Sequence, residues 1–298
     1  MTHEIMKLRN YRLLFLGLAL TLSISNVFAQ VIEKSPPKTP WHHVNLWFDC
    51  ELKNAEFISL SMEFKVEGDI SDSDLIYIAP FSSKINGINF YGGIQTMTGG
   101  WEYKYTRKNI KVGRGGIFSR WADDGKTPMS LDYAQGEYGT LFESAQYEGS
   151  FVSVRRKIDW GNGRYQYEIR KIPNQEVNLG YAWYGAFLTD LGSGATKEVG
   201  RLRFDGSSFR LDKSIATFVE SYGSSRNPIP TMKVSFLSPK INGEKCNNKS
   251  VYVVYPQNNY EPYTRYANTD IDGEFVVATI TKNKVEAVKK DVRLFFKK

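Results

Sequence analysis

Three glutamates in a stretch punctuated by glycines are the residues whose types and spacing most readily suggest chemistry. Glu137, Glu143 and Glu148 follow one another within a short segment. Two carboxyl groups held about 5–10 Å apart can hydrolyse a glycosidic bond, one as acid and the other as base or nucleophile. Glu137 and Glu148 are therefore catalytic candidates, and the alternative is that they are turn and edge-strand residues facing solvent.

Histidine and cysteine offer less chemistry than the glutamates. Beyond residue 29 the only histidines are His42 and His43, whose side chains would point to opposite faces of a strand. The sequence has neither a nucleophile elbow nor a cysteine cluster or spaced histidine pair that would hold zinc. We therefore expect no hydrolytic triad, no zinc site and no cofactor.

A calcium site is the remaining ionic possibility. Asn268, Asp270 and Asp272 place oxygen-bearing side chains at alternate positions before Gly273, as in the first half of an EF-hand loop. The twelfth position is Thr279, so the bidentate glutamate of such a loop is missing. The alternative is a turn capped by Asx side chains, and no resident metal is expected.

Aromatic residues are the strongest compositional bias, with 6 Trp, 18 Tyr and 18 Phe in 298 residues. Trp and Tyr on loops form flat platforms for the faces of sugars, while polar side chains bind the hydroxyls. Trp101, Tyr103 and Trp121 are the predicted glycan contacts, and Arg120 and Gln95 are the predicted polar partners. The alternative is that these aromatic rings fill a core.

The elements that must position these residues show the two-residue alternation of strands. Turn residues such as Gly, Asn, Asp, Ser and Pro separate them. Many short strands of this kind predict an all-β fold, an antiparallel jelly-roll-like β-sandwich. The predicted strands are 43–49, 57–66, 74–81, 116–122, 150–158, 164–172, 180–188, 201–206, 216–222, 232–237, 250–255 and 273–281.

The segment NFYGGIQTMTGGW (89–101) is unusual because it is rich in both glycine and aromatic residues. We predict a strand over 90–95, where Gly92 and Gly93 allow a neighbouring backbone to approach closely or allow a bulge. The remainder, 96–101, is predicted to be a loop that carries Trp101 to the rim of the sandwich.

Proline-rich and polar stretches suggest the domain boundaries. Residues 30–43 read as a Pro-rich leader, 44–225 as the β-sandwich domain and 226–298 as a C-terminal β extension or a small β appendage. The boundary lies near SSRNPIP (224–230), and the final stretch (283–298) is predicted to end in a strand.

The first residues read as a secretory signal. Basic residues precede an apolar run at 13–24, and a small-residue cleavage site ends at Ala29. The apolar run is short for a bilayer span, which needs about 20 residues. We therefore expect cleavage near Ala29, a secreted or periplasmic location and no stable membrane span.

Charge argues against a nucleic-acid partner. Residues 1–29 contain three of the 39 basic and one of the 32 acidic residues, so 36 − 31 leaves about +5 of the formal +7. This excess is dispersed, whereas nucleic-acid-binding proteins cluster their Lys and Arg. It favours an acidic partner, such as an anionic glycan or a membrane surface, only weakly.

Cys50 and Cys246 are the two cysteines of the chain. In an oxidising compartment they could form one disulfide that closes a long loop. The alternative is two separate buried thiols.

Six aromatic and glycine-rich segments follow one another along the chain: FYGGIQ (90–95), IFSRWAD (117–123), YEGSFVS (147–153), WGNGRYQY (160–167), YAWYGAF (181–187) and FVESYG (218–223). Their order resembles a bacterial exported family known as domain of unknown function 3472. The resemblance implies a β-sandwich, often found beside carbohydrate-active modules, but no established reaction. Two departures are Phe151, where the family more often has glycine, and a one-residue shift in YAWYGAF.

Three functions follow as hypotheses. The preferred one is an exported, non-catalytic glycan-binding protein whose partner is a polysaccharide or glycoconjugate. The second is a carbohydrate-active hydrolase or lyase that uses the loop glutamates. The third is an envelope module that binds another protein through a sheet edge.

Overall fold

The computed structural model describes residues 40–52, 55–173, 180–223, 230–256, 264–270, 272–281 and 291–296. The predicted signal peptide and most of the Pro-rich leader lie outside these ranges, and residues 41–43 of that leader belong to the first strand. Within the described ranges no helix is both long and apolar enough to cross a membrane.

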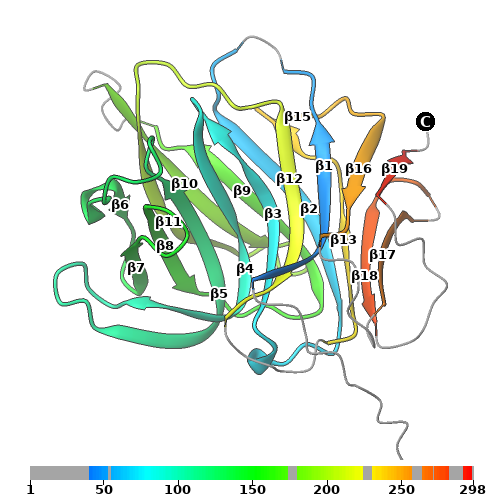
Figure 1. The fold of residues 1–298 in the computed structure, drawn as a ribbon, viewed down its shortest axis with the longest axis horizontal. Coiled ribbons are helices and arrows are strands. Elements are labelled where there is room, and N and C mark those ends of the chain that lie inside the picture. The colour runs from blue at the N-terminus through cyan, green and yellow to red at the C-terminus, as the bar shows by residue number, and fades with distance from the viewer. Residues whose placement is uncertain are drawn as a thin grey trace, which may run out of the picture. The chain divides into compact units, whose positions relative to one another are not determined.

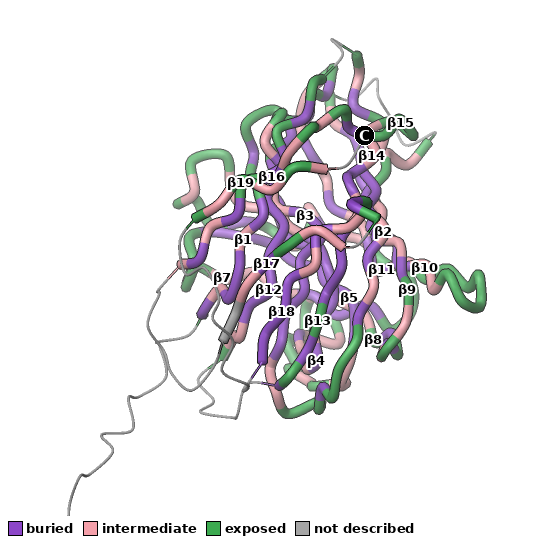
Figure 2. The backbone as a smooth tube through the Cα atoms, turned by 90° about the vertical axis from the view of Figure 1, so that its right-hand side faces the viewer, coloured by how far each residue is buried: buried purple, intermediate pink, exposed green. Residues whose placement is uncertain are grey.

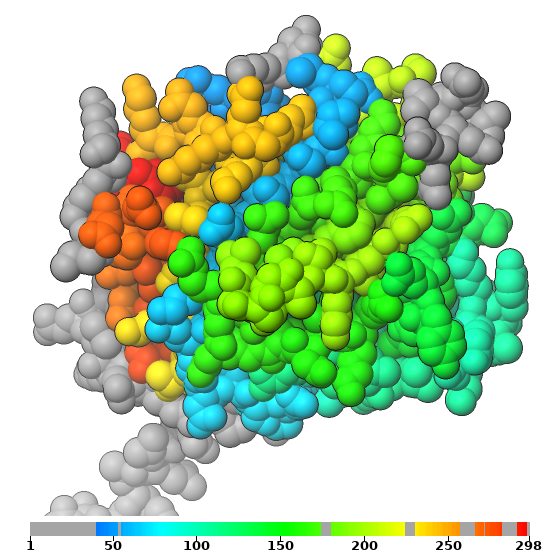
Figure 3. All heavy atoms as spheres, turned by 180° about the vertical axis from the view of Figure 1, so that it is seen from behind, coloured from blue at the N-terminus to red at the C-terminus, as the bar shows by residue number. Residues whose placement is uncertain are grey.

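The described residues form a β-sandwich of two antiparallel sheets, as the alternation predicted. Figure 1 looks onto the first sheet, and Figure 3 shows the second sheet from the opposite side. The first sheet has the order β19 (Val292–Phe295), β16 (Ser250–Val254), β1 (Trp41–Asp49), β12 (Ser214–Ser221), β3 (Ile76–Ile85), β4 (Ile88–Trp101), β5 (Asn109–Trp121), β8 (Phe151–Lys157) and β7 (Thr140–Ala145). The second has the order β17 (Thr264–Thr269), β18 (Val276–Thr281), β13 (Met232–Phe236), β2 (Ser59–Gly68), β9 (Gly163–Lys171), β10 (Tyr181–Asp190), β11 (Thr196–Asp205) and β6 (Ala134–Gln135). In addition, β14 (Lys240–Ile241) pairs with β2, and β15 (Glu244–Lys245) pairs with β14.

The core lies between the two sheets because successive side chains of a strand point to opposite faces. On β9, Tyr165, Tyr167 and Ile169 are buried while the residues between them are partly exposed. Figure 2 shows that buried positions run along the strands and exposed positions gather in the connections. Short polar connections include two 3-10 turns, Asp72–Asp74 and Leu131–Tyr133.

Each of the twelve predicted strands overlaps an observed strand, but the predicted loop at 96–101 is wrong. The strand that begins at Ile88 continues to Trp101 and pairs with β5 as far as Asn109, as a long hairpin. Trp101 also pairs with Phe142 of β7. Backbone pairing on both sides therefore holds this segment in the sheet.

Glycines of β4 serve close packing rather than a loop. A Cβ on Gly92 would lie 2.6 Å from the ring of Tyr167, whose hydroxyl crosses from the second sheet and donates to the carbonyl of Ile117 at 2.7 Å. A Cβ on Gly100 would lie 3.0 Å from the carbonyl oxygen of Phe142. A Cβ on Gly93 would overlap the backbone carbonyl of Ile78, so the predicted approach of a neighbouring backbone is confirmed at Gly93, whereas at Gly92 the close neighbour is the Tyr167 side chain. Gly100 likewise allows the backbone of Phe142 to approach.

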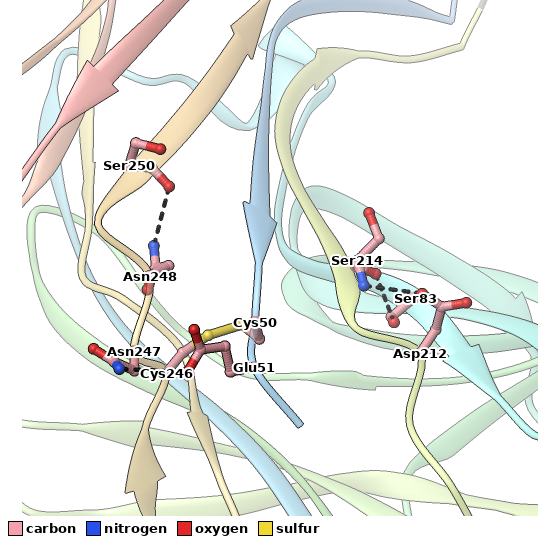
Figure 4. Close-up of a disulfide and its surroundings, with 9 residues drawn as sticks. All are labelled: Cys50, Glu51, Ser83, Asp212, Ser214, Cys246, Asn247, Asn248 and Ser250. Atoms are coloured by element: carbon pink, nitrogen blue, oxygen red, sulfur yellow. Dashed lines mark hydrogen bonds between the residues drawn. A yellow bond between two sulfur atoms is a disulfide. The ribbon is translucent and has the colours of Figure 1, made fainter. Parts of the chain in front are cut away.

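The predicted disulfide is present. Cys50, just beyond β1, is bonded to Cys246, just beyond β15, with the two Cα atoms 5.4 Å apart (Figure 4). Strands after residue 230 extend both sheets, since β16 pairs with β1, β19 pairs with β16, and β13 pairs with β2. The C-terminal region is therefore an extension of the sandwich rather than a separate appendage.

Candidate functional site

The outer face of the first sheet carries a second group of side chains, opposite the core. On β4, β5 and β8 the residues Phe90, Phe118 and Val154 point into the core, so their neighbours along each strand point outward. The outward side chains lie side by side across the strands, because Tyr91 is opposite Ser119, Ser119 is opposite Ser153, and Ser153 is opposite Glu143. We call the following set the outer-face cluster: Tyr91, Trp121, Glu143, Tyr147, Glu148, Phe151 and Arg155.

Aromatic rings form one half of the outer-face cluster. Trp121 lies between Tyr91, at a ring-centroid distance of 4.9 Å, and Phe151, at 6.0 Å. Tyr147 meets Phe151 edge-on at 5.1 Å and is 66% exposed. The indole N–H of Trp121 donates to the backbone carbonyl of Glu148 at 2.9 Å, which fixes the turn beside the indole. The result is an aromatic platform in which Tyr147 is exposed, Tyr91 and Trp121 are partly exposed, and Phe151 is buried beneath them.

An ion pair forms the other half. The guanidinium of Arg155 pairs with Glu143 and donates to the backbone carbonyl of Gly99 at 2.6 Å. The hydroxyl of Tyr147 donates to the same carboxylate at 3.2 Å. Burial alone would lower the pKa of Arg155, but the charge of Glu143 outweighs it, and the pKa is raised. Arg155 is therefore a fixed positive charge on this face.

Glu148 is the carboxyl group most perturbed on this face. Burial raises its pKa, and repulsion from Glu220 and Glu143 raises it further, while Arg155 and His42 oppose the shift. Burial is the largest cause, and the neighbouring carboxylates of Glu220 and Glu143 add to it. Glu148 therefore retains its proton to higher pH than an ordinary glutamate.

Tyr77 lies on β3, opposite Glu220 of β12, and is 3% exposed. Its hydroxyl has no hydrogen-bond partner in the described part of the chain. Its ring packs against Tyr91 and Phe218 at 5.5 and 5.4 Å. Burial raises its pKa well above the usual value. A buried hydroxyl without a partner is uncommon in folded proteins.

His42 borders the cluster from β1. Its Nε2 lies 2.7 Å from the carboxylate of Glu220, its Nδ1 lies 2.8 Å from the amide oxygen of Asn45, and its ring stacks on Phe218 at 4.3 Å. Burial opposes protonation, but the hydrogen bond and the charge of Glu220 outweigh it, so the pKa is raised above 6.5. His43 lies on the other side of the strand, where its Nε2 is 2.9 Å from the hydroxyl of Ser221.

This raised pKa predicts a pH-dependent stability. Because protonated His42 is favoured in the folded chain, its contribution is complete below about pH 6.5 and is lost as the pH rises through the folded-state pKa. The difference in unfolding free energy between the wild type and His42→Gln should shrink between about pH 6 and pH 8.5. Urea unfolding across that range measures it, and Glu220→Gln should show the same trend. A difference that stays constant with pH would contradict the pairing.

The sequence-predicted ligand residues do not all lie together. Arg120 is 1% exposed and points into the core, where its guanidinium donates to the carbonyl of Arg203 and pairs with Asp123. It therefore lies beneath the sheet rather than on the surface where the glycan prediction placed it. Trp121, its neighbour on β5, belongs to the outer-face cluster.

Trp101 and Tyr103 lie at the far end of the β4–β5 hairpin. Arg107 stacks over the indole of Trp101 at 5.0 Å, and Tyr103 is 53% exposed. Gln95 lies on β4, opposite Tyr77, and its backbone carbonyl accepts a hydrogen bond from the indole N–H of Trp160 at 3.1 Å. Of the predicted contacts, Gln95 and Trp121 thus share the outer side of the sheet with the cluster.

The two catalytic candidates are separated. Glu137 pairs with Arg156 at 2.8 Å and lines a cavity of about 300 Å³ with Lys104 and Arg201. Glu148 belongs to the outer-face cluster instead. The structure therefore groups Glu148 with Glu143 and Glu220 rather than with Glu137.

The predicted calcium segment forms a turn between β17 and β18. The carboxylate of Asp270 accepts the backbone N–H groups of Glu274 and Phe275 at 2.8 and 3.1 Å. Asn268 pairs with Val277 in the ladder, and Asp272 lies within the turn. In the described ranges no three His, Cys, Asp or Glu side chains gather as a metal site would require.

Sequence reasoning missed Arg155, Glu220 and His42 as neighbours. Alternation along a strand predicts which side of that strand each side chain occupies, but it does not predict which strands are neighbours. Arg155, Glu220 and His42 lie on β8, β12 and β1, which are distant in sequence. Only the strand order places them on one face. The arrangement can hold a flat ring against the platform, bind hydroxyl groups through charged partners, and donate a proton from Glu148.

Known proteins supply no further guide to this site. No protein-family model matches the chain, and no curated protein matches it either. Its resemblance to the domain of unknown function 3472 family therefore stays a prediction, based on the order of its motifs.

Proposed function

We propose that the outer-face cluster binds a glycan. The observation that carries the proposal is the half-exposed platform of Tyr91, Trp121 and Tyr147 beside the Arg155–Glu143 pair, on a sheet face away from the core. Aromatic faces pack against the apolar faces of sugar rings, and charged partners fixed in place bind hydroxyl groups. The proposed site keeps Trp121 from the sequence prediction, but the residues around it are those of the outer-face cluster rather than Trp101, Tyr103 and Arg120.

Local charge favours a neutral glycan over an anionic one. Glu143, Glu148 and Glu220 share the face with Arg155 and His42. A carboxylate or sulfate on the ligand would meet like charges there, which is unfavourable in a half-buried site. We also propose that the protein is exported, which its N-terminal sequence and the Cys50–Cys246 disulfide support.

Binding is tested by titrating the protein with soluble neutral polysaccharides and following tryptophan fluorescence and heat. Trp121→Ala should weaken binding at least about tenfold, since a central aromatic contact typically contributes more than 1.4 kcal/mol. Trp101→Ala, at the hairpin end, is the matched control and should retain wild-type affinity. Loss in Trp101→Ala alone would place the site at the hairpin, and no response to neutral or acidic polysaccharides would overturn the proposal.

Glycoside hydrolysis is the second candidate, and the raised pKa of Glu148 specifically favours it. A carboxyl group that keeps its proton beside others that share its face is the arrangement of a general acid. Glu148→Gln is expected to abolish release of reducing sugar from a polysaccharide that the wild type cleaves, whereas Glu137→Gln should retain it. If the wild type binds polysaccharides but cleaves none of them, hydrolysis is excluded for those chains.

A further inference from the structure

A single register row crosses the whole first sheet at the level of the outer-face cluster. Tyr91 is opposite Ser119 on one side and Ser82 on the other. Ser82 is opposite Ala216, which is opposite Trp47. The complete cross-strand row runs Glu143, Ser153, Ser119, Tyr91, Ser82, Ala216, Trp47, Tyr252 and Arg293.

This row has a second aromatic contact point on β1 and β16. Trp47 and Tyr252 are direct partners, 40% and 39% exposed. Three strand spacings separate Trp47 from Tyr91, or about 14 Å at about 4.8 Å per strand. Between them the outward side chains of the row are the small Ser82, which is partly exposed, and Ala216, which is 7% exposed, so no large side chain of the row itself stands between the two aromatic points.

The row ends at a polar cavity. Arg293, the last member of the row, lines a cavity of about 730 Å³ beside the disulfide, with Asp49 two residues beyond Trp47. Figure 4 shows Glu51, Asn247 and Asn248 gathered next to the Cys50–Cys246 bond. The acidic residues Asp49, Glu51 and Asp212 are matched by the basic residues Lys213, Lys249 and Arg293. A lining of balanced charge and amide groups suits a neutral, hydroxyl-rich ligand better than an ion.

We propose that the cross-strand row, together with Trp121 against its Tyr91, binds one extended, neutral saccharide chain, which lies across the strands from Trp121 to Trp47 and Tyr252. The inference rests on the proposed glycan binding at Trp121 and adds the ligand class, a linear polysaccharide rather than a terminal sugar. Aromatic contacts separated by small residues allow several consecutive sugar rings to lie on one sheet face. Two contact points on one chain also make affinity depend on chain length, since the second contact is intramolecular once the first has formed.

The test compares short and long oligomers of one sugar. Cello-, xylo- and manno-oligosaccharides of two and of eight units are titrated by calorimetry into the wild type, Trp47→Ala, Trp121→Ala and the exposed control Tyr105→Ala. Trp47→Ala should weaken the octamer at least about tenfold and leave the affinity for the dimer within about twofold. Trp121→Ala should weaken both lengths, and the control should change neither.

The outcomes separate the two proposals. An octamer affinity unaltered by Trp47→Ala but lowered by Trp121→Ala would overturn the extended row and leave the glycan site standing. Equal affinity of the wild type for dimer and octamer would also overturn the row. Affinity that survives Trp121→Ala would overturn the glycan site itself. Tyr252→Ala supplies a second variant should Trp47→Ala unfold, and near-ultraviolet circular dichroism checks the fold of each.

Discussion

Replacing both Cys50 and Cys246 by alanine is expected to lower the free energy of unfolding by about 3–5 kcal/mol. The bond closes a loop over a sequence separation of 196 residues and joins the end of β1 in the first sheet to the segment after β15 beside the second. Without it, the unfolded chain recovers the conformational freedom of that long loop, which stabilises the unfolded state. Urea unfolding of the oxidised wild type and of the double variant measures the difference.

A reductant provides the control for this experiment. Dithiothreitol should shift the wild type towards the double variant and leave the double variant unchanged. Both sulfur-bearing side chains are buried, at 2% and 6% exposure, so part of the loss could come from packing. A stability difference below about 1 kcal/mol, too small for such a loop, would show that the cross-link contributes little.

Arg120→Met is expected to lower the unfolding free energy by about 3 kcal/mol, because each hydrogen bond from a buried charged group contributes about 1.5–3 kcal/mol. The guanidinium of Arg120 donates to the carbonyls of Trp121 and Arg203 and pairs with Asp123 at 2.9 Å. It also lies over the ring of Phe204 at 4.8 Å. Methionine fills a similar space but leaves those two carbonyls without these donors.

Arg203→Met is the matched control, since Arg203 is more exposed, with 25% of its side chain accessible. It should lower stability by less than about 1 kcal/mol, as partly exposed ion pairs usually do. The pair of variants also separates the two possible roles of Arg120. If Arg120→Met keeps wild-type stability but loses glycan affinity, then Arg120 contacts the ligand, as the sequence alone had predicted.

Strand β5 links the core of the sandwich to the outer-face cluster. Arg120 and Trp121 are adjacent on β5, yet one holds the two sheets together and the other belongs to the outer-face cluster. A substitution at Arg120 would therefore disturb the platform through the strand that carries it. For this reason stability has to be measured beside every affinity.

The sequence by itself determined the all-β class and the position of most strands. Alternation of apolar and polar residues, with Gly, Asn and Pro between the runs, is a local signal that a single strand contains. Two cysteines allow only one bridge, so the sequence left two alternatives, a Cys50–Cys246 disulfide or two separate thiols. The close packing of Gly92 could be predicted because glycine inside a strand implies a close neighbour.

Only the tertiary structure decided which side chains share a face. Gly99 and Gly100 favour a loop by composition, but pairing with β5 and contact with β7 hold them in a strand, because long-range ladders outweigh local preference. Glu148 meets Glu220 and His42 through strand order, which connects residues far apart in the chain. Arg120 was predicted to be a polar contact for a glycan, but it lies in the core, where backbone carbonyls and Asp123 satisfy its guanidinium. Local patterns encode strands, whereas a surface assembled from nine of them depends on register and order, which no single segment contains.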